Sequence, residues 1–149
     1  MKQVLSLAFA AMLAVSAQAQ VTFNVDMSCA PDGVDNLFVT GPWCGWCANA
    51  DYNTMTDPDG DGVFTVTVGD LTGEVEYKYA INGFAGQEDL VNDMVDGADC
   101  APVTDFSAYA NRTVMAGPNA VTNDYYGTCD GTCNDETVIS TETQVTFHV

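Results

Sequence analysis

Basic residues are scarce in this chain of 149 residues, which carries three Lys and Arg against 21 Asp and Glu and a formal net charge of −18. Lys2 lies in an apparent export signal, so the rest of the chain sets 21 acids against Lys78 and Arg112, a balance of −19. Nucleic acids and anionic membrane surfaces are bound by basic faces that release counterions. We therefore expect neither nucleic acid nor an anionic membrane as a partner.

Histidine is scarcer still, because His148 is the single example in the chain. A nucleophilic triad that includes histidine is therefore excluded between Gln20 and Cys133. Nothing in the distribution of the 21 carboxylates marks two of them as the catalytic pair that a glycoside hydrolase needs. The prediction is a protein that is not an enzyme.

Long hydrophobic runs are lacking except at the amino terminus, where the apolar segment Val4–Val15 follows Lys2. A membrane-spanning helix needs roughly 20 apolar residues, so we expect no membrane insertion. Residues 17–19 read Ala-Gln-Ala, a small-x-small cleavage site that, with the positive start, is typical of a secretory signal peptide. The prediction is a signal peptide over 1–19, a mature chain from Gln20, and a secreted, extracellular or cell-surface location.

Cysteine, in contrast, is plentiful. The chain also has 47% hydrophobic and 16% charged residues, a composition that allows a buried core. Six cysteines in so short a chain indicate an oxidising compartment and disulfide bonds. The candidates are Cys29, Cys44, Cys47, Cys100, Cys129 and Cys133. Cys129 and Cys133 could close a tight turn on themselves. Cys29 and Cys100 would then join each other or one of the remaining pair, and the sequence does not choose among these pairings.

Short segments with a strand pattern recur along the mature chain, separated by Gly, Asp and Pro turns. They are 21–27, 37–40, 63–68 and 75–81, followed by 112–115 and 121–126 as closing strands. No sustained i, i+3, i+4 apolar stripe is present, apart from one short helix within 87–95. The pattern predicts one all-β domain over 20–133, an antiparallel, disulfide-bonded β-sandwich. The long connection 83–110, which includes Cys100, is expected to be functional or pinned by cross-links.

The hexapeptide at the start of the mature chain recurs near the end of the sequence. Gln20–Val25 reads QVTFNV and Gln144–Val149 reads QVTFHV, so five of six positions match at an offset of 124. The preceding segment 134–143 is polar and has no core pattern. We therefore predict a linker over 134–143 and, over 144–149, the truncated start of a second repeat of a longer tandem protein. His148 would then be an ordinary strand residue of that repeat.

Residues 43–47 read Trp-Cys-Gly-Trp-Cys and match the Trp-Cys-Gly-x-Cys signature of thioredoxin active sites. That chemistry needs the first thiol at a helix amino terminus within a βαβ unit. The following segment 48–56 is a poor helix, and the acidic surface disfavours a thiolate. A zinc site is another use of Cys-x-x-Cys, but a second half with matching spacing is lacking. The prediction is a structural disulfide, with thioredoxin-like thiol–disulfide exchange as the catalytic alternative.

Three carboxylates alternate with Pro and Gly in the segment 57–62, which reads Asp-Pro-Asp-Gly-Asp-Gly. Ca²⁺ prefers such clusters of oxygen ligands, so Asp57, Asp59 and Asp61 are candidate ligands and calcium is a candidate cofactor. The helix–loop–helix type of calcium loop would need a Glu where Val68 stands, so the segment is not of that class. The alternative is an acidic hairpin turn between two strands.

Four segments, taken in order, resemble a known family. They are Val21–Met27, the Gly41-x-Trp43-x-x-Trp46 motif, Met55–Val66 and Glu76–Gly83. Together they are similar to the starch- and glycogen-binding β-sandwich modules, which have immunoglobulin-like topology. They are most similar to the cysteine-bearing repeats of that type in secreted proteins of Bacteroidetes, which often carry Trp-Cys-Gly-x-Cys and an Asn-Arg dipeptide like Asn111-Arg112. The resemblance covers about residues 20–133 and implies a bacterial protein.

This resemblance implies a carbohydrate site. In the glycogen-binding relatives, a Trp at the position of Trp46 and a Lys at that of Lys78 contact the glucan, and a second Trp completes the platform. Here the place of the second Trp is taken by Asn82-Gly83-Phe84, so Phe84 is the nearby aromatic residue. Trp43 is a further candidate, because flat aromatic faces stack on the apolar face of a sugar ring.

The function we expect is a secreted, non-catalytic, glucan-type carbohydrate-binding module of a larger tandem-repeat extracellular protein. Its partner would be a polysaccharide or a cell-surface glycan. The alternative is a structural or adhesive spacer repeat of a cell-surface protein, in which the acidic surface supplies solubility. The corresponding alternative for Lys78 is an ion pair with an acidic neighbour such as Glu74 or Glu76.

Overall fold

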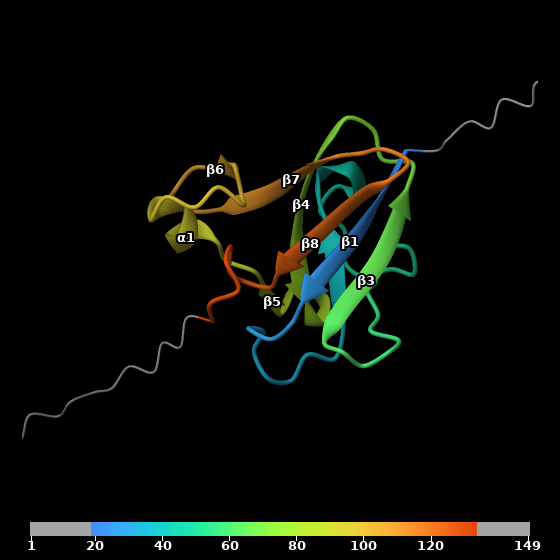
Figure 1. The fold of residues 1–149 in the computed structure, drawn as a ribbon, viewed down its shortest axis with the longest axis horizontal. Helices are drawn as coiled ribbons and strands as arrows, with labels where there is room; N and C mark the ends of the chain where they lie inside the picture. The colour runs from blue at the N-terminus through green and yellow to red at the C-terminus, as the bar shows by residue number, and fades with distance from the viewer. Residues whose placement is uncertain (1–18, 134–149) are drawn as a thin grey trace, which may run out of the picture.

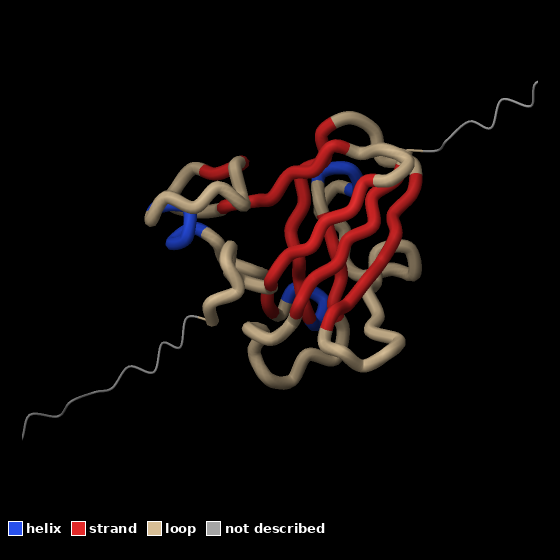
Figure 2. Tube along the Cα trace, viewed as in Figure 1, coloured by secondary structure: helices blue, strands red, loops and turns tan. Residues whose placement is uncertain are grey.

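The computed structural model describes residues 19–133, which form a sandwich of two β-sheets with a smaller lobe beside it (Figures 1 and 2). All but the last residue of the predicted signal peptide lies outside the described residues, as do the predicted linker 134–143 and the predicted second repeat 144–149. In the described part of the chain, no helix has the length and apolar character needed to cross a membrane.

The first sheet has three strands, with β1 (Gln20–Asp26) between β3 (Val63–Gly69) and β8 (Ala120–Tyr125). Every second residue of β1 is buried, as the period-two sequence pattern requires. β1 pairs antiparallel with β3 but parallel with β8. The parallel pair departs from the all-antiparallel arrangement expected from sequence. Parallel neighbours need a long crossover connection, and the whole second sheet supplies it here.

The second sheet is antiparallel, in the order β2-β4-β7-β6 with β5 paired to β4. Its strands are β2 (Leu37–Thr40), β4 (Glu74–Ile81), β5 (Gly86–Gln87), β6 (Val103–Thr104) and β7 (Ala110–Met115). β5 and β6 have two residues each, too few to show an alternating pattern, which is why the sequence did not predict them. The other strands and the disulfide-bonded β-sandwich class are confirmed.

The main core lies between the two sheets and is almost wholly apolar. Phe23 of β1 meets Tyr77 of β4 edge to face, with 4.8 Å between ring centroids. Phe23 is fully buried and Tyr77 is 2% exposed. Each fully buried large side chain contributes about 1.5–3 kcal/mol by leaving water. This core fixes the position of β4, the strand that carries Lys78.

Residues 88–110 form the lobe, which contains α1 (Val91–Val95) and β6 and stands to one side of the sandwich in Figure 1. α1 confirms the short helix expected within 87–95. The lobe has a small core of its own, made of Leu90, Met94, Ala101 and Ala110. A disulfide between Cys100 and Cys129 ties it to the chain after β8. The long connection is therefore pinned by a cross-link, as predicted.

All six cysteines are paired, as Cys29–Cys133, Cys44–Cys47 and Cys100–Cys129. The prediction of disulfide bonds is confirmed, and such bonds are typical of extracellular proteins. Closure of Cys129 onto Cys133 is wrong. The backbone N–H of Cys129 donates to the Asp93 carboxylate at 2.6 Å. This hydrogen bond holds Cys129 against the lobe.

Candidate functional site: an aromatic groove between sandwich and lobe

Three of the four side chains predicted to bind carbohydrate, Trp46, Lys78 and Phe84, line one groove of about 520 Å³. The lobe and its junction with β7 provide the facing wall, with Tyr109 as its aromatic member. The remaining lining residues are Pro42, Glu76, Gln87, Val103, Ala108 and Asn111. Trp46, Phe84 and Tyr109 are 38%, 41% and 43% exposed, so each offers ring surface to a ligand.

Trp46 reaches the groove from the loop that follows the 3-10 helix η1 (Pro42–Cys44). Its backbone is left-handed, with φ of 56°, and the preceding Gly45 has φ of 70°. The N–H of Trp46 donates to the carbonyl of Gly41 at 2.9 Å. A Cβ on Gly41 would meet the carbonyl oxygen of Glu76 and the Trp43 indole, so this position requires glycine.

Phe84 ends the second 3-10 helix, η2 (Asn82–Phe84), at the end of β4. Its ring packs edge-on against Phe38 of β2, with centroids 5.0 Å apart and planes at 87°. The Asn82 side chain secures this turn: its Oδ1 accepts the N–H of Asp35 at 2.8 Å, and its Nδ2 donates to the carbonyl of Gly33 at 2.9 Å. The Asn-Gly turn seen in the sequence therefore presents an aromatic ring to the groove.

Lys78 comes from the middle of β4 and is 8% exposed. Its Nζ donates to Oε1 of Gln87 at the long distance of 3.5 Å. The two ion pairs among residues 19–133 both involve Arg112, so the described structure does not show Lys78 paired with Glu74 or Glu76. An ammonium group has three donors, which leaves donors of Lys78 available at the groove.

The facing wall was missed by the sequence analysis, apart from the expectation that the long connection has a role. The Asp105 carboxylate shapes this wall, because it accepts the N–H groups of Ser107, Ala108 and Tyr109. The bonds from Ala108 and Ser107 hold the pKa of Asp105 below its usual value. Asp105, four residues before Tyr109, was the available signal, since Asp often caps such turns.

Glu76 of β4 and Asn111 of β7 lie on neighbouring strands, and both line the same groove. The Nδ2 of Asn111 donates to Oε1 of Glu76 at 2.7 Å, whereas the buried Oδ1 of Asn111 has no partner. Glu76 is the one carboxylate that lines the groove. The sequence analysis named Glu76 as an alternative ion-pair partner of Lys78 and Asn111 as part of the Asn-Arg dipeptide, but it did not place either residue in a binding site.

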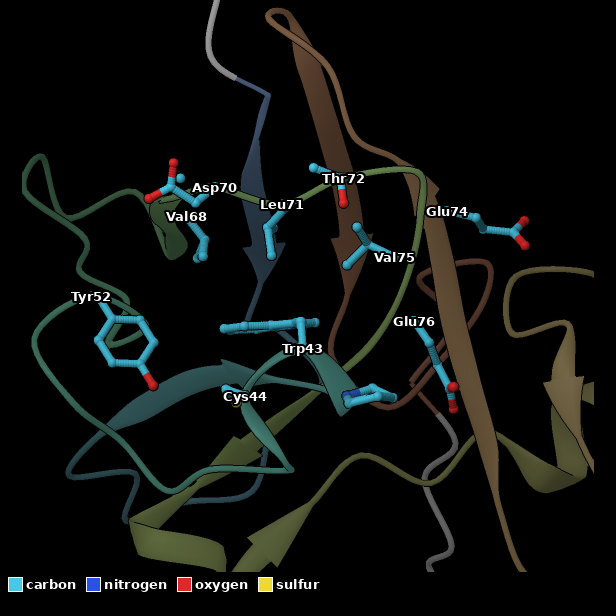
Figure 3. A pocket seen from close by; sticks show the side chains of 12 residues that line it. Trp43, Cys44, Tyr52, Val68, Asp70, Leu71, Thr72, Glu74, Val75 and Glu76 are labelled. Carbon is cyan, nitrogen blue, oxygen red and sulfur yellow. The ribbon is translucent and has the colours of Figure 1, made fainter.

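Trp43, the fourth predicted residue, lies outside the groove. It is half-buried against the main core and lines a separate hollow of about 780 Å³, in which Leu71 and Val75 lie on one side of its ring (Figure 3). Tyr52 stands beside it, with ring centroids 6.4 Å apart. Two tryptophans three residues apart thus have different environments, one against the core and one at the groove.

The Cys44–Cys47 pair lies in the same turn, with Trp43 just before it and Trp46 between the two cysteines. η1 has three residues, and the chain from 45 to 62 contains no α-helix. This is not the strand-to-helix setting in which a helix amino terminus activates a thiolate. Tyr52 and Asn53 instead donate hydrogen bonds to Sγ of Cys47 at 3.2 and 3.4 Å.

Asp57, Asp59 and Asp61, the candidate calcium ligands, are brought together so that one carboxylate oxygen of each lies within 4.8 Å of the others. Two of them also shape the turn. Asp57 accepts the N–H groups of Gly62 and Gly60, and these bonds lower its pKa. Asp61 accepts the N–H of Val63 at 2.9 Å. The segment is therefore an acidic turn before β3, and calcium binding stays a prediction.

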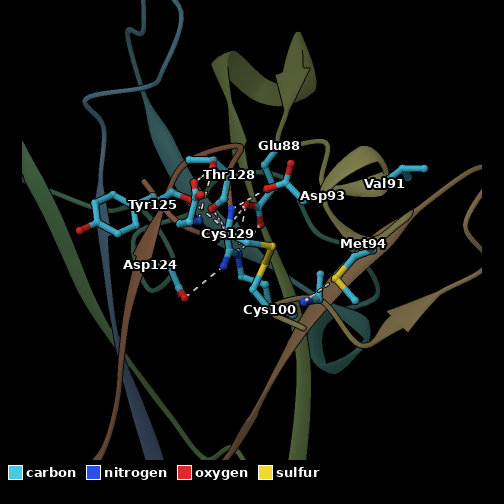
Figure 4. The surroundings of a disulfide bond; sticks show 12 residues. Glu88, Val91, Asp93, Met94, Cys100, Asp124, Tyr125, Thr128 and Cys129 are labelled. Atoms are coloured by element: carbon cyan, nitrogen blue, oxygen red, sulfur yellow. Dashed lines mark hydrogen bonds and ion pairs between the residues drawn. A yellow bond between two sulfur atoms is a disulfide. The ribbon is translucent and has the colours of Figure 1, made fainter. Parts of the chain in front are cut away.

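A buried ionic network, near the disulfide shown in Figure 4, joins the lobe to both sheets. Arg112 of β7 contacts Glu88 of the lobe through Nη2 and Oε2 at 3.0 Å, and Asp124 of β8 through Nη1 and Oδ1 at 3.2 Å. Its Nη2 also donates to the carbonyl of Thr128, next to Cys129. Arg112 therefore holds the three parts of the domain in register.

The hydroxyl groups of Tyr77 and Tyr79 complete this network by donating to Oδ2 of Asp124 at 2.9 and 2.7 Å. Burial, reinforced by the charge of Asp124, raises the pKa of both tyrosines well above the usual value, so both remain donors. Burial also raises the pKa of Glu88, against the opposing effect of Arg112. The network stabilises the positions of β4 and β7, which carry the floor of the groove.

Comparison with known proteins does not assign a family. No family model matches the chain, and a search of curated proteins finds no match. Function is therefore inferred from the groove and its chemistry.

Proposed function

We propose that residues 20–133 form a non-catalytic module that binds a glucan-type polysaccharide in the groove of Trp46, Lys78 and Phe84. The module would belong to a secreted or cell-surface protein, in keeping with its three disulfides. Residues distant in the sequence supply the groove, which distinguishes a formed site from a single exposed motif.

The observation that carries this proposal is the combination of three exposed rings with a small number of polar groups. Trp46 and Phe84 come from the sandwich and Tyr109 from the lobe, so a ligand in the groove meets aromatic surface from both walls. Binding pockets typically combine such apolar walls with few convergent polar groups that set orientation. Lys78 and Gln87 provide donors and acceptors suited to the hydroxyl groups of a sugar.

The proposed module is non-catalytic because of how few carboxylates line the groove. Glycoside hydrolases use two carboxyl groups about 5–10 Å apart across the bond that is cleaved. Glu76 is the one carboxylate lining this groove, and its Oε1 already accepts a hydrogen bond from Asn111. A single carboxylate in the groove supports a module that holds a sugar chain without cleaving it.

Affinity electrophoresis of the full chain against soluble polysaccharides, with pull-down on insoluble ones, tests the proposal. Trp46→Ala should weaken binding by about tenfold or more, because a central aromatic anchor is removed. Tyr125→Ala is the matched control: Tyr125 is 39% exposed, similar to Trp46, but lies on β8 outside the groove. Absence of binding to every glycan, or equal binding by wild type and Trp46→Ala, would overturn the proposal.

The second candidate is a structural or adhesive spacer, which the Cys29–Cys133 disulfide favours. This bond joins the segment after β1 to the end of the described chain, across 104 positions of sequence. Such a cross-link resists opening of the domain, a useful property in a spacer. The same glycan panel separates the two candidates, because a spacer without a glycan site would bind none.

A further inference from the structure

The Cys44–Cys47 disulfide closes a four-residue ring, and Trp46 is inside that ring. A bulky side chain rarely adopts a left-handed backbone such as the φ of 56° at Trp46, because its Cβ strains this conformation. Such a conformation persists only where the surroundings hold it. The position of Trp46 in the groove therefore depends on what constrains this ring.

Hydrogen bonds also constrain the ring, among them those that Tyr52 and Asn53 donate to Sγ of Cys47 at 3.2 and 3.4 Å. On one side, the N–H groups of Gly45 and Trp46 donate to the carbonyls of Pro42 and Gly41 at 3.0 and 2.9 Å. On the other side, Oγ1 of Thr40 donates to the carbonyl of Cys47 at 2.8 Å. The Trp46 side chain is exposed and has no ring partner among the aromatic contacts of the described residues. The disulfide is the covalent part of this support.

We propose, on the basis of the proposed function, that the Cys44–Cys47 disulfide positions Trp46 for binding and makes the affinity of the groove depend on the oxidation state of this pair. With the disulfide formed, Trp46 presents its ring to the groove. With both cysteines reduced, the loop from Cys44 to Cys47 is no longer closed by a covalent bond. Trp46 then leaves the left-handed conformation, and its indole ring is lost from the aromatic wall of the groove.

The same disulfide is the one most readily reduced. It links residues three apart, whereas the other two link residues 29 and 104 apart. In the chain-entropy model, a cross-link stabilises the native state less as its loop becomes shorter. Reopening the four-residue ring therefore gives up the least stability of the three.

The reduction requires an external dithiol, which is the class of reductant that the proposal names. One thiolate of the dithiol attacks a sulfur of the pair, so the Cys44–Cys47 bond breaks and a mixed disulfide forms. The second thiol of the reagent then displaces the bound cysteine. Two electrons and two protons pass to Cys44 and Cys47, and the reagent becomes a cyclic disulfide.

The test compares two double variants of the full chain, each in a Trp43→Phe background so that Trp46 is the only fluorophore of its type. Cys44→Ser/Cys47→Ser removes the proposed positioning bond, and Cys29→Ser/Cys133→Ser removes a disulfide whose residues do not line the groove. Acrylamide quenching reports the exposure of Trp46 without any ligand. Affinity electrophoresis on a polysaccharide that the wild type binds reports the groove.

We expect the acrylamide quenching constant of Cys44→Ser/Cys47→Ser to rise roughly twofold. Trp46 is 38% exposed with the disulfide in place, and its indole ring becomes more exposed when the disulfide is removed. Its affinity should fall about tenfold, whereas Cys29→Ser/Cys133→Ser should keep both values near those of the Trp43→Phe variant with all three disulfides. Mild dithiothreitol should reproduce the loss in the parent protein, and reoxidation should reverse it. An intact far-UV spectrum shows that each variant is folded.

The readouts separate this inference from the proposed function. Unchanged quenching after removal of Cys44 and Cys47 overturns the positioning role, whether or not a glycan is found. Raised quenching with full affinity for a glycan overturns the dependence of binding on oxidation state. Raised quenching with no glycan bound by the parent supports the positioning role and counts against the proposed function alone.

Discussion

The sandwich and the lobe are stabilised in different ways. Thirteen buried residues form the core of the sandwich, against four in the lobe. At about 1.5–3 kcal/mol for each buried large side chain, four residues cannot offset the conformational entropy of ordering residues 88–110, which costs about 1–2 kcal/mol per residue. The lobe therefore depends on its attachments, the Cys100–Cys129 disulfide and the Arg112–Glu88 ion pair.

This difference matters because the groove lies between the two parts. Its Trp46 wall rests on a scaffold with a large apolar core, and its Tyr109 wall rests on a scaffold held by cross-links. The scaffold behind the first wall is thus held by packing, and the scaffold behind the second by bonds that can be removed singly. The first three predictions below separate these two kinds of stabilisation, and the fourth concerns the acidic turn of the sandwich.

The largest effect is expected from Arg112→Met, because it leaves two carboxylates near a buried site without their cation. We expect a loss of about 4–5 kcal/mol in the free energy of unfolding, measured by urea denaturation. Arg112→Met/Glu88→Gln should recover part of this loss, since the fully buried side chain of Glu88 would no longer carry a charge. Equal stability of the single and double variants would contradict the ionic role of the network.

The next effect is expected from truncation of the two cores. Phe23→Ala should cost about 4 kcal/mol and lower the protection of backbone amides from hydrogen exchange in all strands, because Phe23 lies at the centre of the sandwich. Leu90→Ala, equally buried but in the lobe, should lower protection mainly in residues 88–110. Identical exchange patterns for the two variants would show that sandwich and lobe unfold as a single unit.

Removal of the lobe disulfide comes third. Cys100→Ser/Cys129→Ser opens a loop whose ends are 29 residues apart, which should cost about 3.5 kcal/mol. Hydrogen exchange should then be fast in the lobe while β1 remains protected, and the Tyr109 wall of the groove should be lost first. Rapid exchange in β1 as well would show that this disulfide also stabilises the sandwich.

The smallest effect concerns calcium at the turn before β3. If Asp57, Asp59 and Asp61 hold one ion, a hundredfold excess over Kd should add about 2.7 kcal/mol of stability. The melting temperature should rise with millimolar calcium beyond the rise with sodium of matched ionic strength, since salt screens all charges alike. Asp59→Asn should remove the calcium-specific part. Equal shifts with the two salts would leave the segment as a turn alone.

The strands that build the sandwich could be predicted because each is specified locally. β1 and β4 alternate apolar and polar residues, and the Asp-Gly and Asn-Gly segments mark turns, so neighbouring residues contain the signal. The groove could be predicted in part. Trp46, Lys78 and Phe84 were identified from the resemblance to glycogen-binding modules, whereas Tyr109 comes from a connection whose residues show no periodic pattern.

What the sequence determined by itself is therefore the all-β architecture, the use of six cysteines as disulfides and the acidic turn, because each follows from residue types and short-range spacing. What the tertiary structure decided is the pairing of those cysteines, the parallel contact of β1 with β8, and the partial burial of Trp43 beside the exposure of Trp46. These features depend on which distant segments meet. Contacts of that kind are decided by the packing of the whole domain rather than by any stretch of neighbouring residues.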